Sequence, residues 1–273
     1  MTSTITNEQI ERAKTVLENH LVKPLTRAGA IENGLFCIAS QATEWELPSR
    51  FIRLLRQQSR PQDPDAIHKY ATLEVLTDKA AVNAAAKKAG WRFPHQDRFG
   101  PFIDYFGFRK EPWWDLVKGA NSEFRESQVR KIHYMGCKTY SFWHICLGGR
   151  NLIALDVYVM KGLNNLGIEL NGDFWTPVKR PTDGQRVRRT PPKNEYLRIE
   201  QAARELFAQD ERFVIGRPTM EPKRVDMALV DAVLWWKGAN RGDESQRYLF
   251  GGDRSGLILP YAESEKYNPP EEP

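Results

Sequence analysis

The sequence predicts an all-α protein, and two observations carry this prediction. Apolar residues recur at helical spacing through ten segments, whereas strand signals are few and short. The composition is that of a globular chain, with 41% hydrophobic and 27% charged residues among 273. The expected helices span residues 10–22, 49–58, 66–76, 79–89, 99–106, 122–133, 138–147, 157–166, 195–208 and 224–236.

The first expected helix has a recognisable start, because Thr6 and Gln9 have the spacing of a capping box. The polar N-terminus carries no apolar signal core, and no apolar run in the sequence is long enough to cross a bilayer. The three cysteines match no zinc pattern, and their odd number argues against a framework of disulfides. We therefore expect a cytoplasmic protein that makes no contact with membranes.

The segment from Glu123 to Leu166 predicts a helix, a four-residue hairpin, a second helix, a glycine turn, an extended run and a third helix. The hairpin consists of residues 134–137, and Gly136 is expected to supply the permissive backbone that so tight a connection needs. The N–H groups of the hairpin and the dipole of the second helix together suit a phosphate group.

Lys138 and Asp156 are expected to lie at the same level of this arrangement. Lys138 opens the second helix, which climbs about 15 Å. After the glycine turn, residues 152–155 run extended and cover about 13 Å in the return direction. Asp156 then precedes the third helix in an N-cap position. Taken singly, such a lysine is usually solvated and such an aspartate is usually only a cap, so their combination carries the functional prediction.

A paired amine and carboxylate suit the removal of a base from a nucleotide. Breaking an N-glycosidic bond builds positive charge on the sugar, which a carboxylate beside C1′ would stabilise. A lysine amine can attack C1′ and form a Schiff base once the sugar ring opens. Desolvation and the positive end of a helix favour the neutral amine that this attack requires. The base itself must be turned out of the duplex to be reached.

The motif MGCK, followed by an acid in ALD, resembles the helix-hairpin-helix–Gly/Pro–Asp superfamily of DNA glycosylases, in its lysine-bearing, bifunctional branch. The strongest likeness is to the second, largely archaeal, family of 8-oxoguanine DNA glycosylases. The resemblance implies that Lys138 is the Schiff-base nucleophile and Asp156 the essential carboxylate. The family's first hairpin glycine and the proline before it are here Tyr134 and His133, which puts the manner of phosphate binding in doubt.

The same resemblance implies further site residues. The segment LLRQQS resembles a glutamine-bearing helix end that enters the DNA stack in relatives, and the two closing helices resemble those that border the base pocket. Tyr158, two residues beyond the acid, is suited to donate a hydrogen bond to phosphate. The expected DNA-binding residues are Tyr134, Met135, Gly136, Gln57, Gln58 and Tyr158, and the expected base-pocket residues are Trp235, Trp236 and Asp231.

The resemblance also implies two helical domains with a helix-hairpin-helix motif at a DNA-binding cleft. Residues 48–134 are expected to form a central bundle, and residues 1–47 plus 135–258 a second domain that carries the catalytic pair. Within it, residues 171–194 hold six Lys or Arg residues among turn formers and predict a basic loop insertion. The acidic, proline-rich residues 259–273 predict a disordered tail.

The predicted function is excision of a modified base, with 8-oxoguanine the first expectation, followed by β-elimination at the abasic site. The expected partner is double-stranded DNA containing that base, which a net charge of +5 permits. A monomer is expected, associated with the nucleoid if the source is prokaryotic. The chain has no C-terminal cysteine quartet, so neither an iron–sulfur cluster nor another cofactor is expected.

Three alternatives stay open. The first is a glycosylase that acts on another damaged or hypermodified base, including one in foreign DNA, which would make the protein a defence factor. The second is a non-catalytic helix-hairpin-helix adaptor that binds DNA. The third is an unrelated helical interaction protein in which the spacing of Lys138 and Asp156 is accidental.

Overall fold

Helices make up most of the described chain, as the sequence predicts. The computed structural model describes residues 5–19, 26–41, 46–91, 97–110, 112–170, 190–216 and 224–239. The longer helices there are α1 (Asn7–Asn19), α2 (Arg27–Ala39), α3 (Glu46–Ser59), α5 (Lys79–Lys88), α8 (Ser122–Val129), α9 (Cys137–Cys146), α10 (Val157–Asn165), α11 (Lys193–Phe207) and α12 (Met227–Ala239).

Shorter elements connect them. Short α-helices form at α4 (Leu73–Thr77), α6 (Gly100–Phe102) and α7 (Trp113–Lys118), with single 3-10 turns at η2 (Ala66–His68) and η4 (Glu211–Phe213) and a π-helical turn at η3 (Ile103–Gly107). Two short antiparallel strands, β1 (Val214–Ile215) and β2 (Arg224–Val225), pair Val214 with Val225 and Ile215 with Arg224. Among the described helices, none combines the length and apolar character that crossing a bilayer requires.

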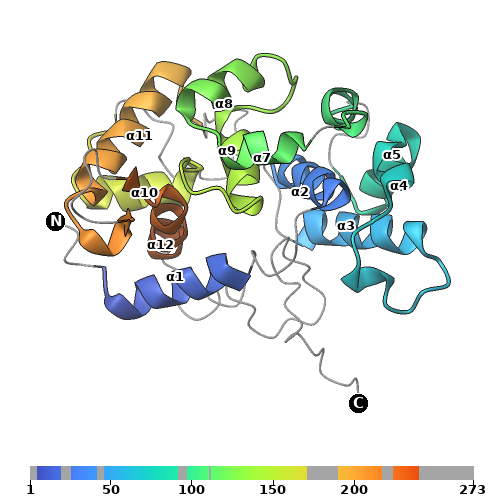
Figure 1. Ribbon diagram of the computed structural model, residues 1–273, viewed down its shortest axis with the longest axis horizontal. Coiled ribbons are helices and arrows are strands. Elements are labelled where there is room, and N and C mark those ends of the chain that lie inside the picture. The colour runs from blue at the N-terminus through green and yellow to red at the C-terminus, as the bar shows by residue number, and fades with distance from the viewer. Residues whose placement is uncertain are drawn as a thin grey trace, which may run out of the picture.

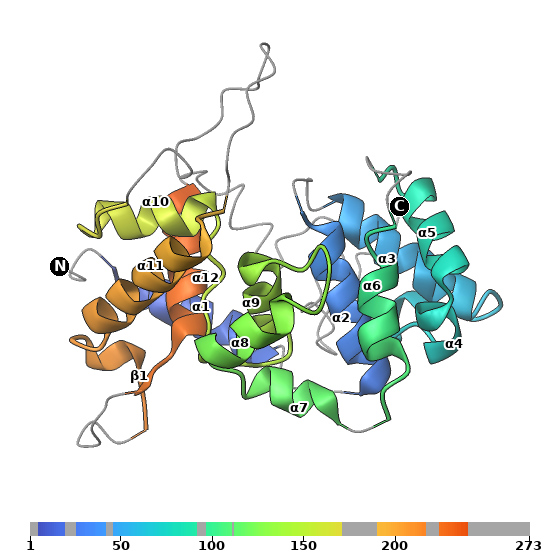
Figure 2. The same cartoon turned by 90° about the horizontal axis from the view of Figure 1, so that it is seen from above.

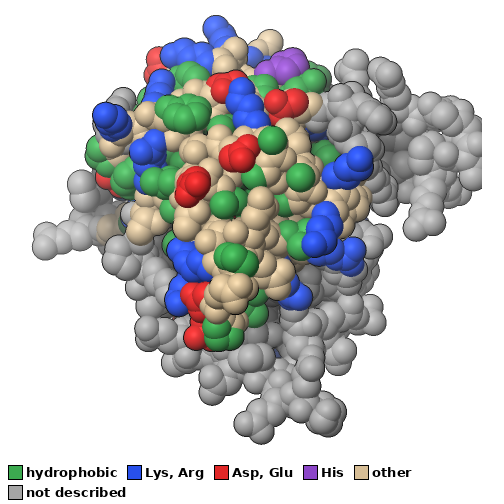
Figure 3. Space-filling view, turned by 90° about the vertical axis from the view of Figure 1, so that its right-hand side faces the viewer, with side chains coloured by type: hydrophobic (Ala, Val, Ile, Leu, Met, Phe, Trp, Pro, Cys, Tyr) green, Lys and Arg blue, Asp and Glu red, His purple; other side chains and the backbone are tan. Residues whose placement is uncertain are grey.

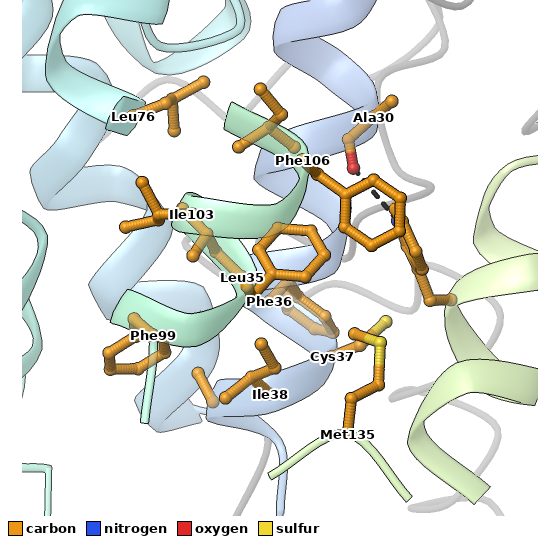
Figure 4. Close-up of a cluster of buried hydrophobic side chains, with 14 of the residues drawn as sticks. Ala30, Leu35, Phe36, Cys37, Ile38, Leu76, Phe99, Ile103, Phe106 and Met135 are labelled. Atoms are coloured by element: carbon orange, nitrogen blue, oxygen red, sulfur yellow. Dashed lines mark hydrogen bonds between the residues drawn. The ribbon is translucent and has the colours of Figure 1, made fainter. Parts of the chain in front are cut away.

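One buried hydrophobic cluster is formed by α2 to α7 together with part of α9 (Figures 1 and 2). Figure 4 shows part of this cluster, in which Phe36 of α2 lies between Phe106 of η3 and Met135. The Trp143 indole of α9 packs edge-on against Phe106, with ring centroids 4.9 Å apart, and donates a 2.9 Å hydrogen bond to the carbonyl of Ala30. This bond fixes α9 along the side of α2.

A second buried cluster is formed by α1, α10, α11 and α12, which lie together on the other side of the molecule (Figure 2). α10 and α1 both pack on α12. Helices α8 and α9 lie between the two clusters (Figures 1 and 2). α9 contributes to both, because Tyr140 and Trp143 are buried in the first cluster and Ile145 in the second. The lysine-bearing helix is therefore held from two sides.

The structure contains two helices that the sequence analysis did not predict, α2 and α7. In α2 every residue from Gly29 to Ala39 is buried, so the helix has no polar face and no periodic pattern that reveals it. α2 joins the first cluster, whereas the predicted boundary groups residues 1–47 with the second domain. α7 is only six residues long, and such a length gives periodicity little to act on.

The helix predicted over 66–76 is broken into η2 and α4. The reason lies in a buried ion pair between Arg56 of α3 and Glu32 of α2. The guanidinium of Arg56 also donates to the carbonyl of Ile67 at 2.6 Å, and Glu32 accepts the backbone N–H of Ala71 at 2.8 Å. Buried side chains thus take up backbone groups that a continuous helix would pair with one another.

Two other predicted boundaries are corrected. α8 ends at Val129 instead of continuing to residue 133. α12 begins at Met227, because Arg224 and Val225 pair with β1 and the carboxylate of Asp226 then accepts the N–H of Leu229 at 3.0 Å. The predicted capping box at the start of α1 is confirmed by the reciprocal bonds of Thr6 and Gln9, at 3.0 and 3.2 Å.

Candidate active site

Asp156 is the N-cap of α10, as the sequence predicts. Its Oδ1 accepts the backbone N–H groups of Tyr158 at 2.8 Å and Val159 at 2.9 Å. The side chain is half-buried, and within the described part of the chain its Oδ2 has no hydrogen-bond partner. One oxygen therefore holds the carboxylate in place, while the other stays available to a ligand.

Lys138 is the second residue of α9 and is also half-buried. Across the described ranges, its ammonium group forms no hydrogen bond and no ion pair. The N-cap of α9 is Gly136, which has no side chain to cap the helix, so the first N–H groups of α9 keep their capacity to bind an acceptor. Lys138 thus combines an unpaired amine with the positive end of a helix.

The carboxyl group of Asp231, on α12, lies where the charges of both predicted catalytic residues affect its pKa. Burial raises the pKa of Asp231 well above its ordinary value, and the negative charge of Asp156 raises it further. A hydrogen bond from the backbone N–H of Ala154, at 2.6 Å, and the positive charge of Lys138 oppose this increase in pKa. The structure therefore brings Lys138, Asp156 and Asp231 into one electrostatic neighbourhood.

Two aromatic rings extend this site. Tyr158 of α10 and Trp235 of α12 pack edge to face, with ring centroids 5.4 Å apart and an interplanar angle of 66°. Trp235 follows Asp231 by one helical turn, so both side chains project from the same face of α12. Both rings are half-buried. The side chain of Trp236, the other predicted base-pocket tryptophan, lies outside the described residues.

The chain returns from Lys138 to Asp156 through a turn built around His144. The buried imidazole donates from Nδ1 to the carbonyl of Val117 at 2.7 Å and accepts the N–H of Asn151 on Nε2 at 3.1 Å. Burial lowers the pKa of His144 to about 4, so the ring is neutral near pH 7. A Cβ on Gly149 would overlap this ring, and Gly148 has a left-handed φ of 82°. Both glycines are needed for the fold-back, the segment that returns the chain from the end of α9 to Asp156.

The connection between α8 and α9 differs from the predicted hairpin in its backbone. Gly136 is extended, with φ −76° and ψ 175°, a conformation open to any residue. The left-handed residue is Tyr134, with φ 66°. The expectation that Gly136 supplies the permissive conformation is therefore wrong. Met135 also differs from its expected DNA-binding role, because its side chain is buried in the first hydrophobic cluster.

Gln41, two residues after the last residue of α2, is a residue of this region that the sequence analysis missed. Its side-chain amide donates to the carbonyl of Tyr134 and to Oγ1 of Thr139, each at 2.9 Å. These bonds tie the end of α2 to the connection and to the first turn of α9. If α2 had been predicted as a helix, Gln41 would have been recognised as lying just beyond its C-terminus.

The connection also forms an open hollow of about 400 Å³, lined by residues 129–136. Arg130, Lys131 and His133 are exposed around it, and the N-terminus of α9 follows directly. The Tyr134 ring is half-buried and lies 5.3 Å from the guanidinium of Arg98. Basic side chains and unpaired helix N–H groups at one place are suited to an anion.

Gln57 and Gln58 are exposed near the end of α3. The preceding residue, Arg56, pairs with Glu32 in the first half of α2, whereas the hairpin meets the other end of α2 through Gln41. The two glutamines are thus not brought together with Lys138 and Asp156. On the face seen in Figure 3, Lys and Arg side chains are interspersed with Asp and Glu.

Two other predictions cannot be followed in the structure. Residues 171–189 of the predicted basic loop insertion, and all of the predicted tail 259–273, lie outside the described residues. Within the described ranges, no group of three or more His, Cys, Asp or Glu residues is arranged to hold a metal ion.

No known family model matches the chain, and no curated protein sequence matches it.

Proposed function

We propose that the chain is a bifunctional DNA glycosylase and abasic-site lyase that excises a modified base, with 8-oxoguanine the first substrate to test. One observation carries this proposal. Among the described residues, a lysine without an ion pair at a helix N-terminus and a capped aspartate with one unbonded oxygen both act electrostatically on the carboxyl of Asp231. An amine and a carboxylate that act on one common group are the pair that cleavage of an N-glycosidic bond requires.

In the proposed reaction, the free oxygen of Asp156 stabilises the positive charge that develops on the sugar as the C1′–N bond breaks. The neutral amine of Lys138 attacks C1′ as the base departs with the bonding electrons, and the proton that the amine gives up passes to the departing base. Opening of the sugar ring then gives a Schiff base between Lys138 and C1′. Loss of a C2′ proton and of the 3′-phosphate by β-elimination completes the lyase step.

The surroundings of the pair support a nucleotide as the substrate. The rings of Tyr158 and Trp235 offer an aromatic surface beside the carboxylates, suited to a base turned out of the duplex. The hollow at residues 129–136 offers Arg130, Lys131 and helix N–H groups to a backbone phosphate. In this proposal, the connection and the two helices beside it act as a helix-hairpin-helix motif, and the two buried clusters belong to domains that flank the DNA.

Borohydride trapping tests this function directly. Wild-type protein incubated with duplexes that contain oxidised, alkylated, deaminated or hypermodified bases is expected to release one of these bases and to form a reducible DNA adduct. The Lys138→Gln variant is expected to form no adduct, and Asp156→Asn to bind DNA but to excise at least about 100-fold more slowly. Adduct formation that survives the loss of Lys138 would remove this residue from the mechanism.

The same substrate panel separates the alternative functions. Release of a base other than 8-oxoguanine keeps the chemistry and changes the substrate. DNA binding without excision on any duplex would instead identify a non-catalytic adaptor. The absence of both binding and excision would reject a role in DNA chemistry.

A further inference from the structure

We infer that Tyr196 is a positioning residue whose phenol joins the lysine-bearing helix to the segment that carries Asp156. This inference rests on the proposed function, since it assigns how the two reacting groups are kept at a fixed separation. Tyr196 lies on α11, and its side chain is fully buried.

The phenol oxygen of Tyr196 meets both sides of the fold-back. It donates to the carbonyl of Ile153 at 2.7 Å and accepts the backbone N–H of Leu155 at 3.1 Å. It also lies 3.4 Å from Oγ of Ser141 on α9. Leu155 directly precedes Asp156, and Ser141 follows Lys138 by one helical turn, on the same face of α9. One oxygen atom therefore contacts the two elements that carry the reacting groups.

The neighbours of Tyr196 keep this oxygen in place. The buried guanidinium of Arg125 lies 4.6 Å from the centre of the Tyr196 ring and donates to Ser141 at 3.0 Å. The same guanidinium pairs with Glu200 at 3.0 Å, one turn after Tyr196 on α11. Asp231 accepts a second N–H of the segment, that of Ala154. The run 153–155 is irregular backbone, yet side chains of α11 and α12 satisfy these buried groups.

Tyr196→Phe removes only the oxygen and leaves the aromatic packing. We expect it to slow single-turnover base excision roughly 10- to 100-fold, because a small displacement of Asp156 weakens charge stabilisation at the sugar. DNA affinity is expected to stay within about twofold, since no DNA contact is removed. Trapping on a preformed abasic site is also expected to persist, because that step needs the amine of Lys138 and an aldehyde, and no bond to a base remains to be broken.

Tyr140→Phe is the matched control. Tyr140 is a buried tyrosine of α9 whose hydroxyl has no hydrogen-bond partner among the described residues, so the same chemical change breaks no contact there. It is expected to leave excision within about twofold of wild type. Ser141→Ala keeps both bonds of the phenol to residues 153 and 155 and removes its contact with α9, together with the hydrogen bond from Arg125. It is expected to slow excision roughly threefold and serves if Tyr196→Phe does not fold.

Amide hydrogen exchange provides a readout that does not depend on activity. Loss of the phenol is expected to accelerate exchange of the Leu155 N–H at least about tenfold in Tyr196→Phe and not in Tyr140→Phe. Unchanged exchange at Leu155, or equal losses of excision and of abasic-site trapping, would overturn the positioning role. If the wild-type protein neither excises a base nor forms an adduct with an abasic site, the proposed function is rejected instead. The hydrogen-exchange comparison then still tests whether the phenol of Tyr196 holds the segment 153–155.

Discussion

The two oxygens of the Asp156 carboxylate have separate tasks. Oδ1 accepts two N–H groups at the start of α10, and Oδ2, which has no hydrogen-bond partner among the described residues, acts on the substrate in the proposed reaction. An asparagine can keep the first task, because its carbonyl oxygen also caps a helix, but it has no charge to offer the sugar. An alanine can perform neither task. Stability and activity at this position are therefore separable by substitution.

We predict that Asp156→Asn has nearly the wild-type free energy of unfolding, whereas Asp156→Ala loses about 1 kcal/mol of this free energy because the helix cap is lost. Both variants are expected to lose base excision. Urea unfolding beside single-turnover excision measures the two effects on the same samples. An Asp156→Asn protein that excises at the wild-type rate would show that the charge of this residue has no part in the reaction.

His144 makes a prediction about pH. Its pKa is lowered to about 4 in the folded protein from an ordinary 6.5, so the unfolded chain binds the proton more readily between these values. Its contribution to stability is therefore complete above pH 6.5 and is lost as the pH falls towards 4. The expected loss is about 3 kcal/mol, because the buried ring resists protonation and each pKa unit of difference corresponds to about 1.4 kcal/mol.

Urea unfolding at several pH values between 7.5 and 4 checks this prediction. The His144→Gln variant is expected to lose the pH slope, although it is less stable throughout, while His133→Gln, at an exposed histidine, keeps it. Equal slopes in wild type and His144→Gln would show that another group causes the acid sensitivity.

At the scale of elements, the extended fold-back was predictable because its parts have strong local signals. Lys138 at a helix start, the glycine pair at 148 and 149, and an aspartate before an apolar helix each point to one conformation. The predicted limits of the second and third helices agree with α9 and α10 to within one residue. The reach of each element then brings Asp156 back towards Lys138.

Other features of the site depend on tertiary contacts and have no local signal. A tyrosine with positive φ is disfavoured by its own Cβ, so the sequence at Tyr134 does not predict a left-handed backbone. In the structure, the carbonyl of this residue accepts a hydrogen bond from Gln41. α2 is buried on all sides, Glu32 and Asn33 included, and lacks the period that marks an amphipathic helix. The phenol of Tyr196 reaches backbone groups more than forty positions away in sequence, a separation at which spacing carries no information.

The connection between α8 and α9 makes a prediction about salt. Arg130 is exposed at the hollow and is expected to contact a DNA phosphate. We predict that Arg130→Gln weakens binding to all duplex sequences alike and reduces the slope of log affinity against log salt by about 1. Lys88→Gln, at an exposed end of α5, is the charge-matched control and is expected to leave the slope unchanged. Equal slopes in both variants would place the phosphate contact elsewhere.

At the scale of the whole molecule, α9 is the element on which the proposed site depends. It lies between the two buried clusters and packs into both, so its first turn, with Lys138, is held from either side (Figure 2). Asp156 and Asp231 come from elements of the second cluster, and the hairpin is tied to α2 of the first through Gln41. The amine of Lys138, proposed as the nucleophile, therefore stands on a helix that is held in place relative to the carboxylates.

Mapping the covalent adduct tests this central claim most directly. Wild-type protein is reduced with borohydride on abasic-site DNA, digested, and analysed by tandem mass spectrometry. We predict a single sugar-derived modification, on Lys138, with Lys131 and Lys161 unmodified although they lie nearby in sequence. An adduct on another lysine, or spread over several, would contradict the assignment of the nucleophile and with it the proposed meeting of Lys138 and Asp156 at the sugar.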